Sequence, residues 1–188
     1  MKLLVCISKS PDTTSKIEFT DSNRKFNESG VQYIVNPYDE WYALVRALEL
    51  KEQSGGSVTT ITVGGAADDS IIRKALAIGA DNAVRIDAEA ADAYYTAFQI
   101  AQYAKSNGFD IVFTGKETIN YNGSQVGGML AELLDQPFIS LATKMEMNGN
   151  TATIDKEMVG GVEVIELNTP FVISAAKGMA EQRIPNMR

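Results

Sequence analysis

Thr114–Met129, with the sequence TGKETINYNGSQVGGM, decides how the fold of this chain is interpreted. The apolar run Ile111–Phe113 comes directly before it and predicts a buried strand. A helix is expected next, because apolar residues recur there at the spacing of one helical face. These residues are Val126, Met129, Leu130, Leu133 and Leu134. The stretch therefore predicts a strand, a loop that contains glycine, and the start of a helix.

Such a loop brings free backbone N–H groups to a helix N-terminus, where they bind phosphate well. The hydroxyl of Ser124, the amide of Gln125 and the backbone N–H groups can together hold one phosphate. An ordinary connection between a strand and a helix is the alternative. Two stronger motifs are missing, since no Gly-x-Gly-x-x-Gly follows the first strand and no Walker A sequence is present. The choice between the two interpretations therefore depends on the rest of the chain.

The composition of the 188 residues is that of one domain with a sizeable core, because 45% of them are hydrophobic. The net charge of -7 at pH 7 argues against a nucleic-acid partner. The apolar runs are too short to cross a bilayer, so we expect no membrane insertion. The first residues, MKLLVCISKS, predict a strand rather than a signal peptide. The single cysteine, Cys6, excludes an internal disulfide and favours a reducing, cytoplasmic location.

Histidine is absent from the sequence. Its absence excludes every Ser-His, Cys-His and His-metal arrangement. No cluster of cysteines is available for zinc or iron–sulfur ligation. We therefore expect no metal site and no catalytic residues, and a protein that binds ligands rather than an enzyme.

Strands alternate with helices through the first 136 residues. The strands are predicted at Lys2–Ser8, Ser57–Val63, Asn82–Ile86 and Asp110–Thr114, with helices over residues 36–53, 68–78 and 91–106 and after Gln125. This order predicts a parallel sheet with helices on both faces, in which ligands bind beyond the carboxyl ends of the strands. Four loops leave those ends and should converge: Ser8–Thr14, Asn36–Asp39, Gly64–Asp68 and Gly115–Gln125. Their convergence favours the phosphate-binding interpretation of the first stretch.

The start of the first helix is predicted from Asn36, Pro37, Asp39 and Glu40. Asn36 is expected to be the N-cap and Pro37 the first helical residue, while Asp39 and Glu40 suit the positive end of the helix dipole. The position of Asn36 also suits contact with a ribose or an adenine. In the next two helices, one set of residues is expected to point inward. The set consists of Ile71, Ile72, Ala75, Leu76, Tyr94, Phe98 and Ala101.

The remaining segments form smaller elements. Residues 17–35 predict a hairpin or excursion from the sheet, and Asn148–Asn150 predicts a hairpin turn between two strands of the tail. Further strands are expected at Val162–Leu167 and Phe171–Ser174. The fold class is therefore α/β, with a Rossmann-like, doubly wound, mainly parallel sheet and a small C-terminal β extension. We expect a nucleotide-binding core over residues 1–136, a β extension of the same domain over 137–176, and a partner-recognition segment over 177–188.

Four stretches, in their order and spacing, resemble the β subunit of electron transfer flavoproteins (the ETF β/FixA family) across nearly the whole chain. They are Asn36–Glu40, Ile72–Asp81, Thr114–Asn120 continuing into Gln125–Leu134, and Gly160–Val164 before Thr169–Phe171. The resemblance implies an adenine nucleotide alpha hydrolase-like fold that binds AMP. It also implies an ETF α subunit that carries most of the FAD site. Such a pair moves electrons from acyl-CoA and related dehydrogenases to ETF:quinone oxidoreductase and the quinone pool.

The resemblance also implies a set of binding residues. For AMP these are Cys6, Asn36, Pro37, Tyr38, Asp39, Val63, Gly115, Asn122, Gly123, Ser124, Gln125 and Val126. Ser124, Gln125 and Val126 would contact the phosphate. Tyr38 and the loop that holds Thr13 would approach the flavin of the α subunit. For partner recognition the implied residues are Glu181, Arg183 and Ile184.

The sequence departs from the family pattern in two places. Asn120-Tyr121-Asn122 stands where the family carries an acidic run. The family also continues past the position of Arg188, so a truncated chain is expected. Two other functions stay open: a bifurcating β subunit with its own FAD, and a stand-alone regulator that binds ATP or AMP like the universal stress proteins.

Overall fold

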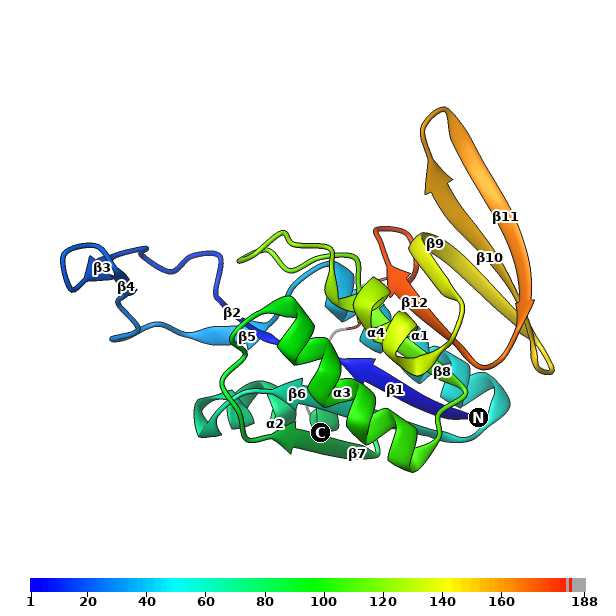
Figure 1. Ribbon diagram of the computed structural model, residues 1–188, viewed down its shortest axis with the longest axis horizontal. Coiled ribbons are helices and arrows are strands. Elements are labelled where there is room, and N and C mark those ends of the chain that lie inside the picture. The colour runs from blue at the N-terminus through cyan, green and yellow to red at the C-terminus, as the bar shows by residue number, and fades with distance from the viewer. Residues whose placement is uncertain (182, 184–188) are drawn as a thin grey trace.

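The computed structural model describes residues 1–181 and residue 183. Its main sheet has eight strands in the order β11-β10-β9-β12-β8-β1-β6-β7 (Figure 1). The parallel part comprises β1 (Lys2–Cys6), β6 (Ser57–Val63), β7 (Asn82–Ile86), β8 (Ile111–Gly115) and β12 (Phe171–Ala175). The chain winds outward from β1 in both directions, first through β6 and β7 and then through β8 and β12. This order confirms the predicted doubly wound fold and places its switch point between β1 and β8.

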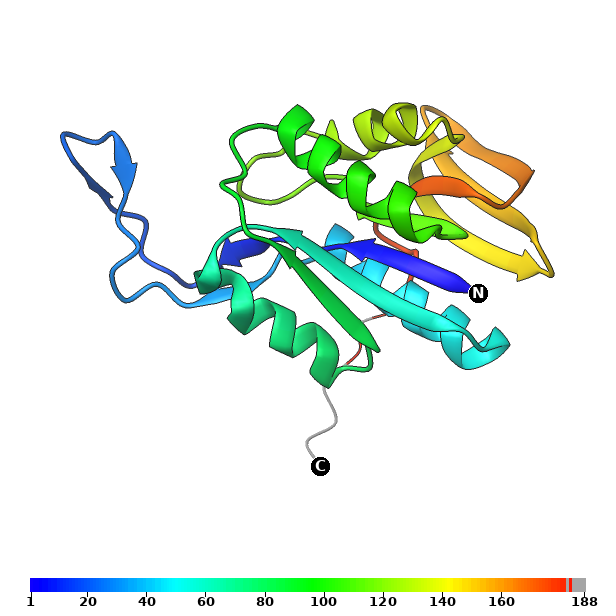
Figure 2. The same ribbon diagram turned by 60° about the horizontal axis from the view of Figure 1, so that its bottom comes forward.

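Helices cover both faces of the sheet (Figure 2). They are α1 (Asp39–Ser54), α2 (Asp69–Ala77), α3 (Ala93–Asn107) and α4 (Val126–Leu134), with a short 3₁₀ helix at Ala66–Asp68. Alternate residues of β1 point to opposite faces. Leu3 belongs to the core cluster that contains α1 and α2, whereas Leu4 belongs to the cluster that contains α3 and α4. β1 therefore lies at the centre of two apolar layers.

The tail adds antiparallel strands to the same sheet. These strands are β9 (Phe138–Asn148), β10 (Thr151–Met158) and β11 (Gly161–Asn168). β9 pairs parallel with β12 and antiparallel with β10, and the predicted turn at Asn148–Asn150 joins β9 to β10. Met145 and Ile154 are buried in the cluster beneath α1, so the extension shares the core of the parallel sheet.

A second excursion leaves the body between β1 and α1. Its base pairs β2 (Lys9–Pro11) with β5 (Tyr33–Val35), and its tip is the small hairpin of β3 (Phe19–Thr20) and β4 (Lys25–Phe26). Figures 1 and 2 both show this arm extending well away from the sheet. The chain returns from the arm directly to the start of α1, which faces the switch point.

Three helix predictions were wrong in detail. α1 begins at Asp39, and its N-cap is Tyr38 rather than Asn36. Leu76 is 39% exposed, because Ile71, Ala75 and Ile78 already form the buried stripe and Leu76 falls beside it. In α3 the rings of Tyr94 and Phe98 are also exposed. The buried residues of α3 are small ones with one isoleucine: Ala97, Ile100, Ala101 and Ala104. Their small size lets α3 lie close to the sheet and to α4.

Among the residues that the structure describes, no helix is both long enough and apolar enough to cross a bilayer.

Gly115, at the end of β8, lies against the first turn of α1. A Cβ atom added to this residue would lie 2.8 Å from the backbone nitrogen of Glu40 and 2.9 Å from its Cγ. Both distances are shorter than a carbon atom tolerates, and one of the contacts is with backbone. Gly115 therefore serves close packing between β8 and α1, in addition to the binding role implied by the family resemblance.

We predict that Gly115→Ala lowers the free energy of unfolding by about 1–3 kcal/mol, because the backbone of α1 must move to accept the methyl group. Gly123→Ala is the matched control in the same loop, since nothing lies within 4 Å of a Cβ there. Urea unfolding followed by the fluorescence of Trp41, the single tryptophan, measures both variants. Equal stabilities for the two variants would contradict the packing argument.

Candidate functional site

The four predicted loops meet at the carboxyl edge of the sheet, but only three of them follow its strands, because Asn36–Asp39 follows β5 of the separate two-stranded sheet. The loop after β1 contacts the loop after β6 through Lys9, whose Nζ lies 3.0 Å from Oδ1 of Asp68. The segment before α1 contacts the loop after β8 through Asn36. Its Oδ1 accepts a hydrogen bond from the backbone N–H of Ile119 at 3.0 Å, and its Nδ2 donates to Oδ1 of Asn120 at 2.9 Å. The backbone N–H of Asn36 also donates to the carbonyl oxygen of Ser8 at 2.9 Å, so direct contacts join all four loops.

Asn36 is fully buried, and its side chain does not cap the helix because it bonds to Ile119 and Asn120. Its side chain is turned toward the loop after β8, 83 residues away in the sequence. Tyr38 takes the capping position with φ 67° and ψ -106°, and it makes no side-chain capping bond. Such a backbone conformation is strained for a residue with a side chain, and strain of this kind concentrates at functional sites. The ring of Tyr38 is 56% exposed.

Glu40 is a residue of this site that the sequence analysis assigned only to the helix dipole. Its carboxyl group is buried and accepts hydrogen bonds from Ser8, from the backbone N–H at 2.6 Å and from the hydroxyl at 2.9 Å. Burial raises the pKa of Glu40 to about 8, and the neighbouring charge of Asp39 adds to the rise, while the bonds from Ser8 oppose it. A signal was available, because Ala43, Leu44 and Ala47 follow Glu40 on the buried face of the helix.

Asp39 links the start of α1 to the loop after β8. One of its carboxylate oxygens lies 3.9 Å from Nζ of Lys116 and accepts a bond from the backbone N–H of Glu117 at 3.3 Å. Burial raises the pKa of Asp39, and the charge of Lys116 and the bond from Glu117 oppose that rise. Lys116 also pairs with the carboxylate of Glu117 at 3.1 Å. The three charged groups therefore form one small network at the mouth of the site.

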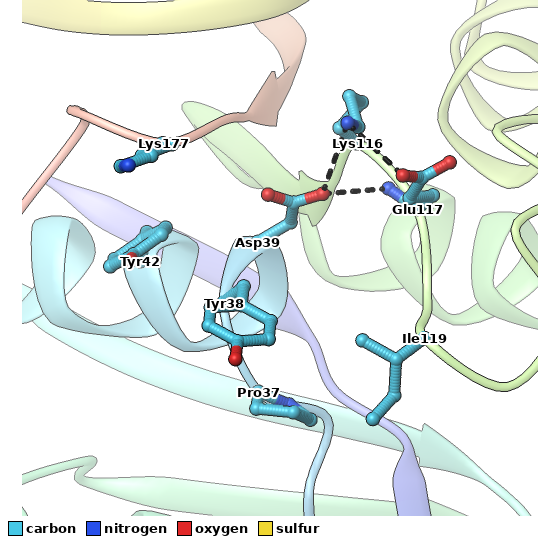
Figure 3. Close-up of a pocket in the computed structure, with 8 residues that line it drawn as sticks. All are labelled: Pro37, Tyr38, Asp39, Tyr42, Lys116, Glu117, Ile119 and Lys177. Atoms are coloured by element: carbon cyan, nitrogen blue, oxygen red, sulfur yellow. Dashed lines mark hydrogen bonds and ion pairs between the residues drawn. The ribbon is translucent and has the colours of Figure 1, made fainter.

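A cavity of about 490 Å³ opens beside this network (Figure 3). It is lined by Pro37, Tyr38, Asp39, Tyr42, Lys116, Glu117, Ile119 and Lys177. Figure 3 shows Tyr38 and Ile119 on neighbouring walls, the charged network at one end and Lys177 beside Tyr42. Three of the residues expected to bind AMP, Pro37, Tyr38 and Asp39, thus line this cavity together.

The other expected binding residues lie outside the lining of this cavity. Cys6 is buried in the core at the end of β1, where burial raises the pKa of its thiol. Val63 ends the neighbouring strand β6 and is half-buried. Residues 122–125 are exposed, and Val126 begins α4. Of the expected partner-recognition residues, Arg183 lies 2.7 Å from Glu52 of α1, Glu181 is exposed, and Ile184 lies outside the described residues.

The start of α4 has the character of an anion site. Its N-cap, Gln125, makes no side-chain capping bond, and the first N–H groups of any helix lack partners within the helix. The positive end of the helix dipole lies at the same place. Gly127 allows this turn to approach β8, since a Cβ there would lie 2.8 Å from Oγ1 of Thr114. The hydroxyl of Ser124 donates to Oε2 of Glu117 at 3.3 Å, so it is engaged within the protein.

The fold and the loop cluster at its switch point define a doubly wound α/β protein of the Rossmann-like class. Residues 24–187 match the family model of the electron transfer flavoprotein domain. The chain is 38% identical to the electron transfer flavoprotein subunit beta of Bacillus subtilis, an alignment that covers all of this chain and 73% of the relative. It is 36% identical to the subunit of the same name from Syntrophomonas wolfei, over all of this chain and 74% of that protein. It is 32% identical to the protein FixA of Azorhizobium caulinodans, over 97% of this chain and 68% of that protein.

The chain therefore belongs to the electron transfer flavoprotein family, among its β subunits and FixA proteins. This result confirms the resemblance found in the sequence.

We predict that the carboxyl group of Glu40 makes stability depend on pH. Because its pKa in the folded protein is about 8, above the ordinary value of 4.5, its stabilising contribution is complete below pH 4.5. That contribution is lost as pH rises through 8, by at most about 5 kcal/mol. Glu40→Gln does not titrate, so the wild type should lose stability relative to this variant between pH 5 and pH 8. Urea unfolding across this range measures the difference.

Glu49→Gln removes a carboxylate elsewhere on α1 and serves as the control for this titration. Its pH profile should run parallel to that of the wild type. The Asp39 carboxylate and the Cys6 thiol, which interact electrostatically with Glu40, are unchanged in both variants. Parallel profiles for the wild type and Glu40→Gln would show that Glu40 does not titrate in this range.

Proposed function

We propose that this chain is the electron-carrier β subunit of a heterodimeric electron transfer flavoprotein. It binds AMP itself and helps to enclose an FAD that is held mainly by the α subunit. The observation that carries the proposal is family membership over nearly the whole chain, together with four loops that converge at the switch point. The chain supplies no catalytic residues of its own in this function, and it acts in the cytoplasm.

The AMP lies across the converging loops in this proposal. The phosphate occupies the N-terminus of α4, near Ser124, Gln125 and Val126, where helix N–H groups and the helix dipole favour an anion. The ribose and the adenine extend toward the ends of β1 and β6, which carry Cys6 and Val63. These two strands are direct neighbours in the sheet, which supports one continuous site.

The α subunit approaches the cavity that Tyr38 and Asp39 line. The exposed ring of Tyr38 and the loop that carries Thr13 are the parts of this chain that face the flavin in the proposal. Electrons arrive from acyl-CoA dehydrogenases or related dehydrogenases and leave for ETF:quinone oxidoreductase and the quinone pool. Glu181, Arg183 and Ile184 remain the proposed start of the segment that recognises a dehydrogenase.

The nucleotide released on denaturation tests the proposal directly. Mass spectrometry of the supernatant should detect AMP when the chain is produced together with its α subunit. FAD should also be released, at one flavin per heterodimer. Two flavins would favour the bifurcating alternative, and a chain that binds ATP tightly without any α subunit would favour the stress-protein alternative. Well-assembled protein that neither binds an α subunit nor releases AMP would refute the proposed function.

We predict that Ser124→Ala combined with Gln125→Ala reduces AMP retention by about tenfold or more. Two polar side chains beside the phosphate are lost, and each charge-assisted hydrogen bond contributes roughly 1.5–3 kcal/mol. The amount of AMP that remains bound after dialysis, relative to protein, measures the effect. The matched control is Gln102→Ala combined with Ser106→Ala, two exposed residues on α3. Equal AMP content in the two double variants would count against the phosphate position.

A further inference from the structure

Three side chains, those of Asn36, Ser8 and Glu40, connect the start of α1, the loop after β1 and the loop after β8 by consecutive hydrogen bonds. The chain of bonds starts at the backbone N–H of Ile119, which donates to Oδ1 of Asn36 at 3.0 Å. That bond determines the orientation of the Asn36 amide, because a backbone N–H can only donate. Nδ2 of Asn36 must therefore donate on its other side. It does so to Oδ1 of Asn120 at 2.9 Å and to the hydroxyl of Ser8 at 3.4 Å.

The hydroxyl of Ser8 connects Asn36 to Glu40. The Ser8 oxygen accepts from Asn36, so its own proton must go to an acceptor. Among the described residues, the acceptor for this proton is the Glu40 carboxyl group, whose two oxygens lie at 2.9 and 3.0 Å. The backbone N–H of Ser8 donates to the same group at 2.6 Å. Glu40 thus accepts hydrogen bonds from both donors of Ser8.

Burial makes the series sensitive to the loss of any member. Asn36 has no exposed surface, and Glu40 is 7% exposed. A buried donor that loses its acceptor costs more than an exposed one, because water does not replace the lost bond. Ser8 itself is half-buried, and its backbone N–H and hydroxyl would lose their acceptor if the side chain at position 40 could not accept hydrogen bonds. The loop after β8, which Asn36 holds at Ile119 and Asn120, would then lose part of its support.

We propose that Glu40 is a positioning residue of the nucleotide site: acting through Ser8 and Asn36, it holds the loop that runs from β8 to α4 in its binding conformation. The inference rests on the proposed function, because it assigns Glu40 to the AMP site. Glu40 itself need not touch the nucleotide. It fixes the positions of the loop after β1 and the loop after β8 relative to the start of α1.

Two substitutions at position 40 separate a positioning role from general packing. Glu40→Gln keeps the shape and an oxygen that can accept both bonds from Ser8. It is the appropriate isostere at pH 7, since burial raises the pKa of Glu40 to about 8 and the group is then mainly neutral. Glu40→Met has a similar length but accepts no comparable hydrogen bond. Ser8→Ala and Ser8→Thr form the corresponding pair at the next residue, because threonine keeps the hydroxyl.

The experiment measures AMP affinity by calorimetry at pH 7 for the full chain assembled with its α subunit. We expect Glu40→Met and Ser8→Ala each to weaken AMP binding by about tenfold, while Glu40→Gln and Ser8→Thr stay within about threefold of the wild type. The combination of Glu40→Met with Ser8→Ala should bind no more weakly than Glu40→Met alone, because Glu40→Met already removes the acceptor of the Ser8 hydroxyl. Glu49→Met, at an ion-paired glutamate elsewhere on α1, is the control and should bind like the wild type.

Hydrogen exchange at the Ile119 amide, without added nucleotide, gives a second and independent result. Exchange should be faster in Glu40→Met than in Glu40→Gln. If the wild type binds no AMP, the proposed function fails, and faster exchange in Glu40→Met would still support the connection to the loop. If Glu40→Met does not fold, the two variants at Ser8 decide. Wild-type affinity together with wild-type exchange in Glu40→Met, or in Ser8→Ala, would overturn the proposal.

Discussion

The buried amide of Asn36 is the interaction on which the loop cluster depends. It joins the start of α1 to the loop after β8, two segments that are distant in the sequence, at the point where the strand order reverses. An amide suits this position because it can donate and accept in one plane, so it satisfies a backbone N–H and a side-chain oxygen together. A carboxylate could accept at both places but could not donate to Asn120. The loops therefore meet through a neutral group, at an edge where an anion is proposed to bind.

Parallel pairing explains why the partners of Asn36 are available at all. β1, β6 and β8 run in one direction, so the segments that follow them leave the same edge of the sheet. Close packing then brings the start of α1 onto the end of β8, where only glycine fits at position 115. The geometry of the site thus follows from the winding of the chain and from one glycine. The backbone arrangement of the site therefore does not depend on the side chains proposed to bind the nucleotide.

The sequence predicted the elements and their winding well, because apolar periodicity and glycine positions are local properties. The strands at Ser57–Val63 and Asn82–Ile86 have the predicted bounds. The sequence was less informative where a polar residue has two possible partners. Asn36 satisfies the local rule for an N-cap, yet tertiary contacts use its amide elsewhere, and no local pattern reveals a partner 83 residues away. Glu40 was misjudged because a carboxylate near a helix start is usually solvated, whereas this one faces the core.

At residues 120–122 the sequence departs from the acidic run of its family, and the contacts of these residues are consistent with an anion site. Asn120 accepts the bond from Asn36 without adding a negative charge beside the proposed phosphate. Asn122 has φ 50°, in the left-handed region that asparagine tolerates better than most residues. The carboxylate that remains near the start of α4 is Glu117, and Lys116 pairs with it at 3.1 Å. An acidic run at 120–122 would add unpaired negative charge at the same edge. Asn120 therefore keeps the connection to Asn36, and both asparagines lower the electrostatic cost of the phosphate that is proposed to bind at the start of α4.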